Sequence, residues 1–304
     1  MRITPILLAI LIAATSCTTP ENSTTSAPSK PKILCTTSIM TDWVSNITGE
    51  GFEVKALLDK GIDPHTYKPS KEDLDAIRGA DVIIYHGIHL EGKIIDVLEQ
   101  IQGKLIIDAA AKVPEAKIIS DPTFQASKDP HYWFDTDIVK IVLSHIGEEL
   151  LKAYPENTSN ILESVQQYQE SIDRTADSVT VIINTIPESN RLVITTHDAL
   201  SYWARKFDMR VNTLQGASTV SEFGLKEVTE LVNFICDENI PTIFLENIVS
   251  AQAMESVQSG CKAKGCQVTI GPELLSDSLG REKNQDTYLE MLTYNANLLA
   301  RYLK

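Results

Sequence analysis

Three histidines stand at positions suited to metal binding. His65 lies in Gly-Ile-Asp-Pro-His-Thr-Tyr and His131 lies in Asp-Pro-His-Tyr-Trp-Phe-Asp, so each follows an Asp-Pro pair. Proline restricts the backbone beside the imidazole, and a preset ligand loses less conformational entropy when it binds a metal. His197 ends an apolar run that is predicted to be a strand. Each histidine alone would more often be an ordinary surface or hydrogen-bonded residue, but three at loop or strand-end positions indicate a metal site.

Asp277, in Leu-Leu-Ser-Asp-Ser-Leu-Gly, adds a carboxylate to this set. By itself it could cap a helix, because aspartate is favoured at helix N-termini. Three imidazoles and one carboxylate suit a borderline cation, Zn²⁺ or a neighbouring transition metal. His86 and His89 form a further His-x-x-His pair, but their loop lacks the Asp-Pro anchor. We therefore expect both to have a structural or ligand-supporting role.

The elements that position these residues begin with a first lobe, residues 32–155. Continuous apolar runs alternate there with helical patterns, which is typical of a parallel sheet covered by helices on both faces. The predicted strands are Ile33–Thr37, Val54–Leu58, Asp81–His86 and Leu105–Ala110, and the predicted helices are Lys71–Arg78 and Ile94–Gln102.

A long linking helix is predicted over residues 156–187. Its apolar residues recur mostly at spacings of three or four: Ile161, Val165, Tyr168, Ile172, Val179, Ile182, Ile183 and Ile186. Such a stripe is typical of a helix, and about thirty residues would reach roughly 45 Å. Two shorter helices are the alternative, although no internal glycine or proline favours a break.

The alternation of strands and helices restarts in a second lobe, residues 188–304. The predicted strands are Leu192–Thr196, Thr242–Glu246 and Gln267–Ile270, and the predicted helices are Leu225–Asn239, Ala251–Lys264 and Glu290–Leu303. The predicted fold class is therefore α/β, with two lobes that each hold a mainly parallel sheet flanked by helices, bridged by one long rigid helix. In such folds ligands bind in the cleft, near the carboxyl ends of the strands.

The N-terminus predicts export. A positive charge at Arg2, a short apolar run and small residues before Cys17 together indicate a signal peptide over residues 1–16. The run is too short to span a membrane, which takes about 20 residues. The junction resembles the lipobox of bacterial lipoproteins, which implies lipidation of Cys17; an ordinary signal with an incidental cysteine is the alternative. Residues 17–31 are rich in Ser, Thr and Pro and are predicted to be a flexible tether. We expect a protein lipid-anchored to the cell membrane or facing the periplasm.

The composition limits the classes of protein and partner. The chain has 304 residues, 43% of them apolar and 22% charged, which excludes an intrinsically disordered protein. Its 27 Lys+Arg stand against 41 Asp+Glu, and the net charge of −14 argues against nucleic acid or an anionic lipid surface as the main partner.

The remaining cysteines have no finger-like zinc spacing. Cys35 and Cys236 lie in apolar runs, so both are expected to be small core residues. Export would permit a disulfide between Cys261 and Cys266, which flank a short segment.

The sequence resembles a known family at these residues: the metal-binding solute-binding proteins of bacterial ABC importers, the ZnuA/TroA/MntA group. The resemblance covers nearly all of the chain after the tether. Its motifs, in family order, are Gly-Ile-Asp-Pro-His-Thr-Tyr, Gly-Ile-His-Leu-Glu-Gly, Asp-Pro-His-Tyr-Trp-Phe-Asp, Thr-Thr-His-Asp-Ala-Leu-Ser-Tyr-Trp, Gln-Gly-Ala-Ser-Thr-Val-Ser-Glu and Ser-Asp-Ser-Leu-Gly. The resemblance implies that His65 and His131 are metal ligands from the first lobe, and His197 and Asp277 from the second. It also implies a monomer that delivers its metal to a membrane permease with a cytoplasmic ATPase.

The metal is expected to be Zn²⁺ or Mn²⁺, bound as transported substrate. His197 favours zinc, because manganese-type members of the family often carry Glu at that position. The segment that begins at Gln215 instead resembles members assigned to manganese, and the chain lacks the long His-rich loop of many zinc binders.

Two other functions are possible. A surface adhesin is one, because some members of the family carry that label. A zinc hydrolase is the other, with Glu222 or Glu246 as the base, but it needs an open water position and four protein ligands would fill the site. We therefore expect a binding protein and not an enzyme.

Overall fold

The computed structural model describes residues 30–120, 128–220 and 223–304. The expected signal peptide, Cys17 and nearly all of the expected tether lie outside the described residues, as does Glu222. No helix in the described part of the chain has the length and apolar character needed to cross a membrane.

The first lobe is built on a parallel sheet with strand order β2-β1-β3-β4. The strands are β1 (Lys32–Cys35), β2 (Glu53–Ala56), β3 (Val82–Tyr85) and β4 (Leu105–Asp108). The central strands β1 and β3 are buried over almost their whole length, which explains their continuous apolar sequence. The four predicted strands are confirmed, with slightly different ends.

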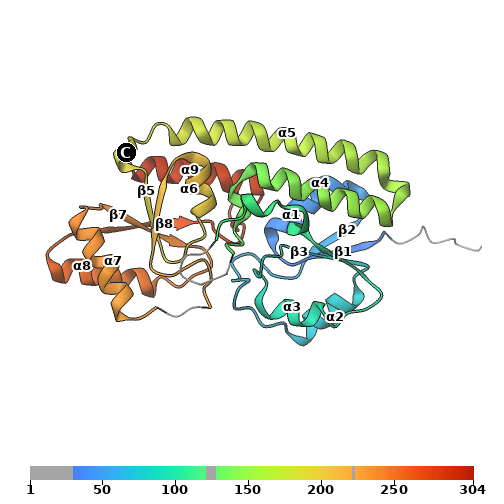
Figure 1. Ribbon diagram of the computed structural model, residues 1–304, viewed down its shortest axis with the longest axis horizontal. Helices are drawn as coiled ribbons and strands as arrows, with labels where there is room; N and C mark the ends of the chain where they lie inside the picture. The colour runs from blue at the N-terminus through green and yellow to red at the C-terminus, as the bar shows by residue number, and fades with distance from the viewer. Residues whose placement is uncertain (1–29, 121–127, 221–222) are drawn as a thin grey trace, which may run out of the picture.

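Helices cover both faces of this sheet (Figure 1). Ile33 and Cys35 of β1 pack in one cluster with α1 (Ser38–Thr48) and α4 (Thr136–Ala153). Leu34, between them, points to the other face and packs with residues of α2 (Lys71–Gly79) and α3 (Gly92–Leu98). Side chains of a strand point alternately to opposite faces, so a strand covered on both faces is apolar at every position.

The long helix α5 (Thr158–Ile183) runs along both lobes (Figure 1). It packs on α1 and α4 of the first lobe and on α9 (Tyr288–Tyr302) of the second. Its apolar stripe, which includes Ile161 and Ile172, is buried in a single cluster shared by both lobes. One continuous helix is therefore present. It is shorter than residues 156–187, because a 3₁₀ turn (Pro155–Asn157) precedes it and the helix ends at Ile183.

In the described part of the second lobe, the strands form two separate parallel pairs where one sheet was expected. β5 (Leu192–Thr195) pairs with β6 (Arg210–Thr213), and β7 (Thr242–Glu246) pairs with β8 (Thr269–Leu274). β5 and β7 lie next to each other. The helices are α6 (Ser201–Phe207), α7 (Leu225–Asp237), α8 (Gln252–Lys264) and α9. β6, α6, α1 and α4 were not predicted from the sequence.

The expected pairing of Cys261 with Cys266 is wrong, and so is the expectation that Cys236 is only a core residue. Cys236, near the end of α7, forms a disulfide with Cys266, and their Cα atoms are 5.5 Å apart. The left-handed Gly265 ends α8 and reverses the chain, which brings Cys266 toward α7. Cys261 stays within α8 as a free thiol and packs in the apolar core of the lobe.

Candidate metal centre

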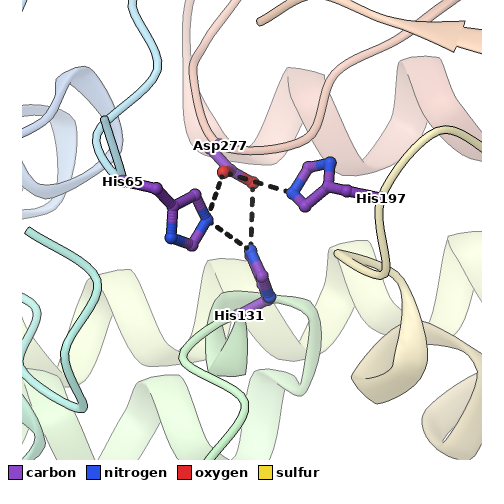
Figure 2. A group of neighbouring side chains, drawn as sticks. All are labelled: His65, His131, His197 and Asp277. Carbon is purple, nitrogen blue, oxygen red and sulfur yellow. Dashed lines mark hydrogen bonds and ion pairs between the residues drawn. The ribbon is translucent and has the colours of Figure 1, made fainter. Parts of the chain in front are cut away.

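Four side chains from distant parts of the chain meet between the lobes, namely His65, His131, His197 and Asp277 (Figure 2). The Nε2 atom of His65 lies 3.2 Å from Nε2 of His131 and 3.1 Å from Oδ2 of Asp277. Asp277 Oδ1 lies 3.4 Å from His131 Nε2, and its Oδ2 lies 3.4 Å from His197 Nε2. One candidate ligand atom from each residue lies within 4.8 Å of all the others. The structure thus brings together all four residues singled out from the sequence.

The ends of strands position these side chains. His65 lies in the loop after β2, His197 lies two residues beyond the end of β5, and Asp277 lies just beyond β8. His131 immediately precedes the 3₁₀ turn Tyr132–Phe134 that leads into α4. Carboxyl ends of parallel strands gather at one edge of a sheet, and here the edges of both lobes face each other.

The spacing of the four groups suits a metal ion. A tetrahedral zinc site with bonds of about 2.0–2.1 Å places its ligand atoms roughly 3.3–3.4 Å apart. The separations given above, 3.1–3.4 Å, are close to this value. The four residues are at most 3% exposed, and neither oxygen of Asp277 accepts a well-aligned hydrogen bond. Because a buried charge is costly without compensation, a cation among these atoms would stabilise the arrangement.

Asp129 fixes His131. Its Oδ1 atom accepts a hydrogen bond from the backbone N–H of His131 at 2.9 Å and lies 2.7 Å from the ring Nδ1. A proton on Nδ1 then leaves the lone pair of Nε2 for a metal. Asp63 likewise accepts the backbone N–H of His65 at 2.8 Å. The repeated Asp-Pro-His pattern is visible in the sequence and predicts a restricted backbone through its proline, but the hydrogen bond from the histidine N–H to the aspartate is seen only in the structure.

Glu246, at the end of β7, fixes His197. Its Oε1 lies 2.7 Å from His197 Nδ1, while its Oε2 accepts the backbone N–H groups of Thr196 and His197 at 2.9 Å each. From the sequence, Glu246 was a candidate only for the base of a hydrolase. No local signal in the sequence links it to a histidine 49 positions away.

The Gly-Ile-His-Leu-Glu-Gly loop packs against the backbone of His65. The buried carboxylate of Glu91 accepts backbone N–H groups of His86 and Gly87 and so shapes the loop. Gly92 has φ +37°, and a Cβ atom there would lie 2.3 Å from the carbonyl oxygen of His65. Only glycine therefore lets the His65 backbone pack this closely.

His86 and His89 do not join the cluster of four. His86 is buried, with Nε2 2.7 Å from the Thr37 hydroxyl and Nδ1 3.0 Å from the Tyr132 hydroxyl, and burial lowers its pKa to about 3. It acts as a neutral structural link. His89 is exposed and has a left-handed backbone (φ +63°).

The charges of the centre shift the pKa values of its members. Burial alone would lower the pKa of His131, but the negative charges of Asp277 and Asp129 outweigh it and raise the pKa to about 9. Burial is likewise outweighed at His197, where Glu246 and Asp277 raise the pKa well above its usual value. Burial lowers the pKa of His65, and the imidazoles hold that of Asp277 well below its usual range against the effect of burial. The raised pKa values of His131 and His197 favour protonated imidazoles at these two positions in the metal-free protein.

These features define a class: a two-lobed α/β binding protein with a long connecting helix and a nitrogen- and oxygen-lined candidate metal centre between its lobes. Residues 33–302 match the family described as zinc-uptake complex component A periplasmic (ZnuA), and the chain belongs to this family.

Relatives within the family are named for different metals. The chain is 35% identical over 297 residues to the manganese-binding lipoprotein MntA of Bacillus subtilis, covering 96% of this chain and 95% of MntA. It is 32% identical over 275 residues to the zinc-binding protein TroA of Treponema pallidum, covering 90% and 89%. The solved structure of that periplasmic zinc-binding protein TroA superposes with a TM-score of 0.86, covering 90% of this chain and 99% of TroA. The manganese ABC transporter substrate-binding lipoprotein PsaA of Streptococcus anginosus is 24% identical, covering 97% and 96%.

Proposed function

We propose that this protein is the extracytoplasmic substrate-binding lipoprotein of an ABC importer. It captures Mn²⁺ or Zn²⁺ between its lobes and delivers the ion to a membrane permease driven by a cytoplasmic ATPase. One observation carries this proposal: two side chains from each lobe converge on one buried point at distances that fit a metal ion. The names of the relatives support the link to transport.

His65 and His131 supply the ligands of the first lobe, and His197 and Asp277 those of the second. Four protein ligands complete a tetrahedral shell and leave no open position for a reactive water. Glu246 contacts His197 and two backbone N–H groups, so it is engaged as a support for the ligand. This arrangement favours binding and release of the ion over hydrolysis.

The organisation of the chain follows from this role. We propose a signal peptide at residues 1–16, lipid on Cys17, a tether at 17–31, lobes at 32–155 and 188–304, and the linking helix between them. The protein works as a monomer whose only attachment to the membrane is this lipid. Replacement of Cys17 by Ala should move the protein from the membrane fraction to the soluble fraction, and an unchanged membrane fraction would count against the anchor.

Elemental analysis of protein purified without added metal tests the proposed function. We expect about one equivalent of manganese or zinc per chain. After removal of the metal, both ions should bind, and Zn²⁺ should displace Mn²⁺, since nitrogen-rich sites bind Zn²⁺ more tightly. The metal carried in the cell is then set by availability. A protein that binds neither ion would contradict the proposal.

A further inference from the structure

The two Asp-Pro-His loops meet the second lobe in different ways. The loop of His131 is joined to it by buried hydrogen bonds: Tyr202 hydroxyl to Asp129 carbonyl at 2.9 Å, Trp133 indole to Ser276 carbonyl at 3.0 Å, and Tyr288 hydroxyl to Trp133 carbonyl at 2.6 Å. Water cannot easily replace buried bonds of this kind. The His131 side of the centre is therefore its fixed side.

The loop of His65 is joined to the second lobe at two places. Farther from His65, the Gly61 backbone N–H donates to the Ser278 hydroxyl at 2.7 Å and Arg281 donates to the Lys60 carbonyl at 2.6 Å. Next to His65, the link is the side chain of Asp63. Its Oδ1 atom accepts the backbone N–H of His65, while Oδ2 accepts the Thr219 hydroxyl at 2.7 Å and the Thr66 hydroxyl at 2.9 Å. The side chain of Asp129 makes no such link: its Oδ1 contacts the backbone and the ring of His131, and its buried Oδ2 has no hydrogen-bond partner among the described residues. Asp63 and Thr219 are only half-buried, so water can compete for this bond.

Thr219 belongs to a segment that is also bound to the loop of His197. The backbone N–H of Gln215 donates to the Thr196 carbonyl at 2.9 Å, and the N–H of Asp198 donates to the Gly216 carbonyl at 3.1 Å. A chain of hydrogen bonds therefore runs from His65 through Asp63 and Thr219 to the residues on either side of His197. These hydrogen bonds connect His65 of the first lobe with the loop of His197 in the second lobe, independently of the metal.

We infer that the Asp63–Thr219 hydrogen bond is a latch that sets the rate of metal release, with Asp63 as a positioning residue for His65. The inference rests on the proposed function. The four ligands are almost fully buried, so the ion can leave only when a part of their surroundings opens. Opening is easiest where a half-exposed bond joins the lobes, and loss of this bond removes the link between Thr219 and the loop of His65. While the metal is bound, this hydrogen bond holds the loop of His65 against the second lobe and slows metal release. When the lobes are moved apart, the hydrogen bond breaks and the metal can leave.

Stopped-flow release of Mn²⁺ into an excess of a chromogenic chelator tests the latch. Thr219→Val keeps the shape of the side chain but removes its donor, and we expect release about tenfold faster, as for loss of a hydrogen bond to a charged acceptor. The association rate should stay within about twofold, because the ligands themselves are unchanged. Thr219→Ser restores the hydroxyl and should restore slow release.

Thr66→Val is the matched control, because Thr66 donates to the same oxygen of Asp63 from within the first lobe. It should release metal at the wild-type rate. In an Asp63→Ala background, Thr219→Val should have no further effect. Wild-type release from Thr219→Val, or equal acceleration in Thr66→Val, would overturn the latch while leaving the proposed function intact. A wild-type protein that binds no metal would overturn the proposed function and the latch with it.

Discussion

At the scale of single residues, the centre depends on which ring nitrogen each histidine offers. Asp129 and Glu246 lie against the Nδ1 atoms of His131 and His197, so the Nε2 atoms face the other ligands. Asp129 is two residues from its histidine and could have been recognised from the sequence. Glu246 comes from a neighbouring strand, and only the fold reveals its role. Residue types thus predicted the candidate ligands, but not all of the groups that orient them.

Removal of any one candidate ligand should weaken metal binding severely. His65→Ala, His131→Ala, His197→Ala and Asp277→Ala each delete one of four bonds, and we expect at least a hundredfold loss of affinity, beyond the 10–100-fold typical of a supporting group. The measurement is calorimetric titration with Mn²⁺. His89→Ala is the control and should bind like wild type, because His89 is exposed and outside the cluster. Wild-type affinity in any two of the four variants would refute the assignment.

Metal binding should release protons and weaken as the pH falls. The pKa of His131 is raised to about 9, so at pH 7 its imidazole is protonated in the metal-free protein and must lose this proton to bind. Apparent affinity should therefore increase with pH up to about 9 and fall further from pH 7 to 5. Calorimetry in two buffers of different ionisation enthalpy measures the protons released at pH 7. A value of zero, with affinity flat over this range, would show that the histidines are not ligands.

At the scale of elements, long and strongly patterned segments were predicted well. Buried strands and the linking helix show the clearest patterns. The strands β1, β3, β5 and β7 are continuous apolar runs, and the apolar residues of α5 recur every three or four positions. β6 (Arg-Val-Asn-Thr) is mostly polar and only partly buried, so it has no apolar run, and the seven residues of α6 are too few to show a helical period. Helix α4 is buried over a wide face, which weakens its contrast of apolar and polar sides. The disulfide partner of Cys266 depends on the packing of α7 against α8, which no spacing in the sequence reports.

The start of α3 should be sensitive to a single added methyl group. Gly92→Ala would push against the carbonyl oxygen of His65 and strain a left-handed backbone position, so His65 should shift and metal affinity should fall about tenfold. Gly79→Ala is the control, because a Cβ atom there meets nothing within 4 Å and its φ is ordinary. Equal metal affinity in the two variants, measured by titration, would show that the loop does not support the centre in this way.

At the scale of the whole molecule, α5 and a shared apolar cluster join the lobes. A rigid helix resists wide hinge bending, so metal binding should cause only a small closure together with local ordering. Small-angle scattering of metal-free and metal-loaded protein should give nearly equal radii of gyration. A large decrease on loading would contradict the rigid connection.

The bound metal should also stabilise the fold, because the complete set of ligands exists only in the native state. At a concentration of free metal about a thousand times the dissociation constant, the gain is about 4 kcal/mol. Thermal unfolding should therefore shift upward by several degrees with metal, and much less in Asp277→Ala. An equal shift in both proteins would place the stabilising site elsewhere.

The proposed function requires that His65, His131, His197 and Asp277 together hold the transported ion. A crystal structure of the metal-loaded protein, with anomalous scattering recorded at the manganese or zinc absorption edge, tests it most directly. We expect one strong anomalous peak between the three Nε2 atoms and the Asp277 carboxylate, at about 2.0–2.2 Å from its ligand atoms. A peak at another place, or fully loaded protein with no peak among these four side chains, would contradict it.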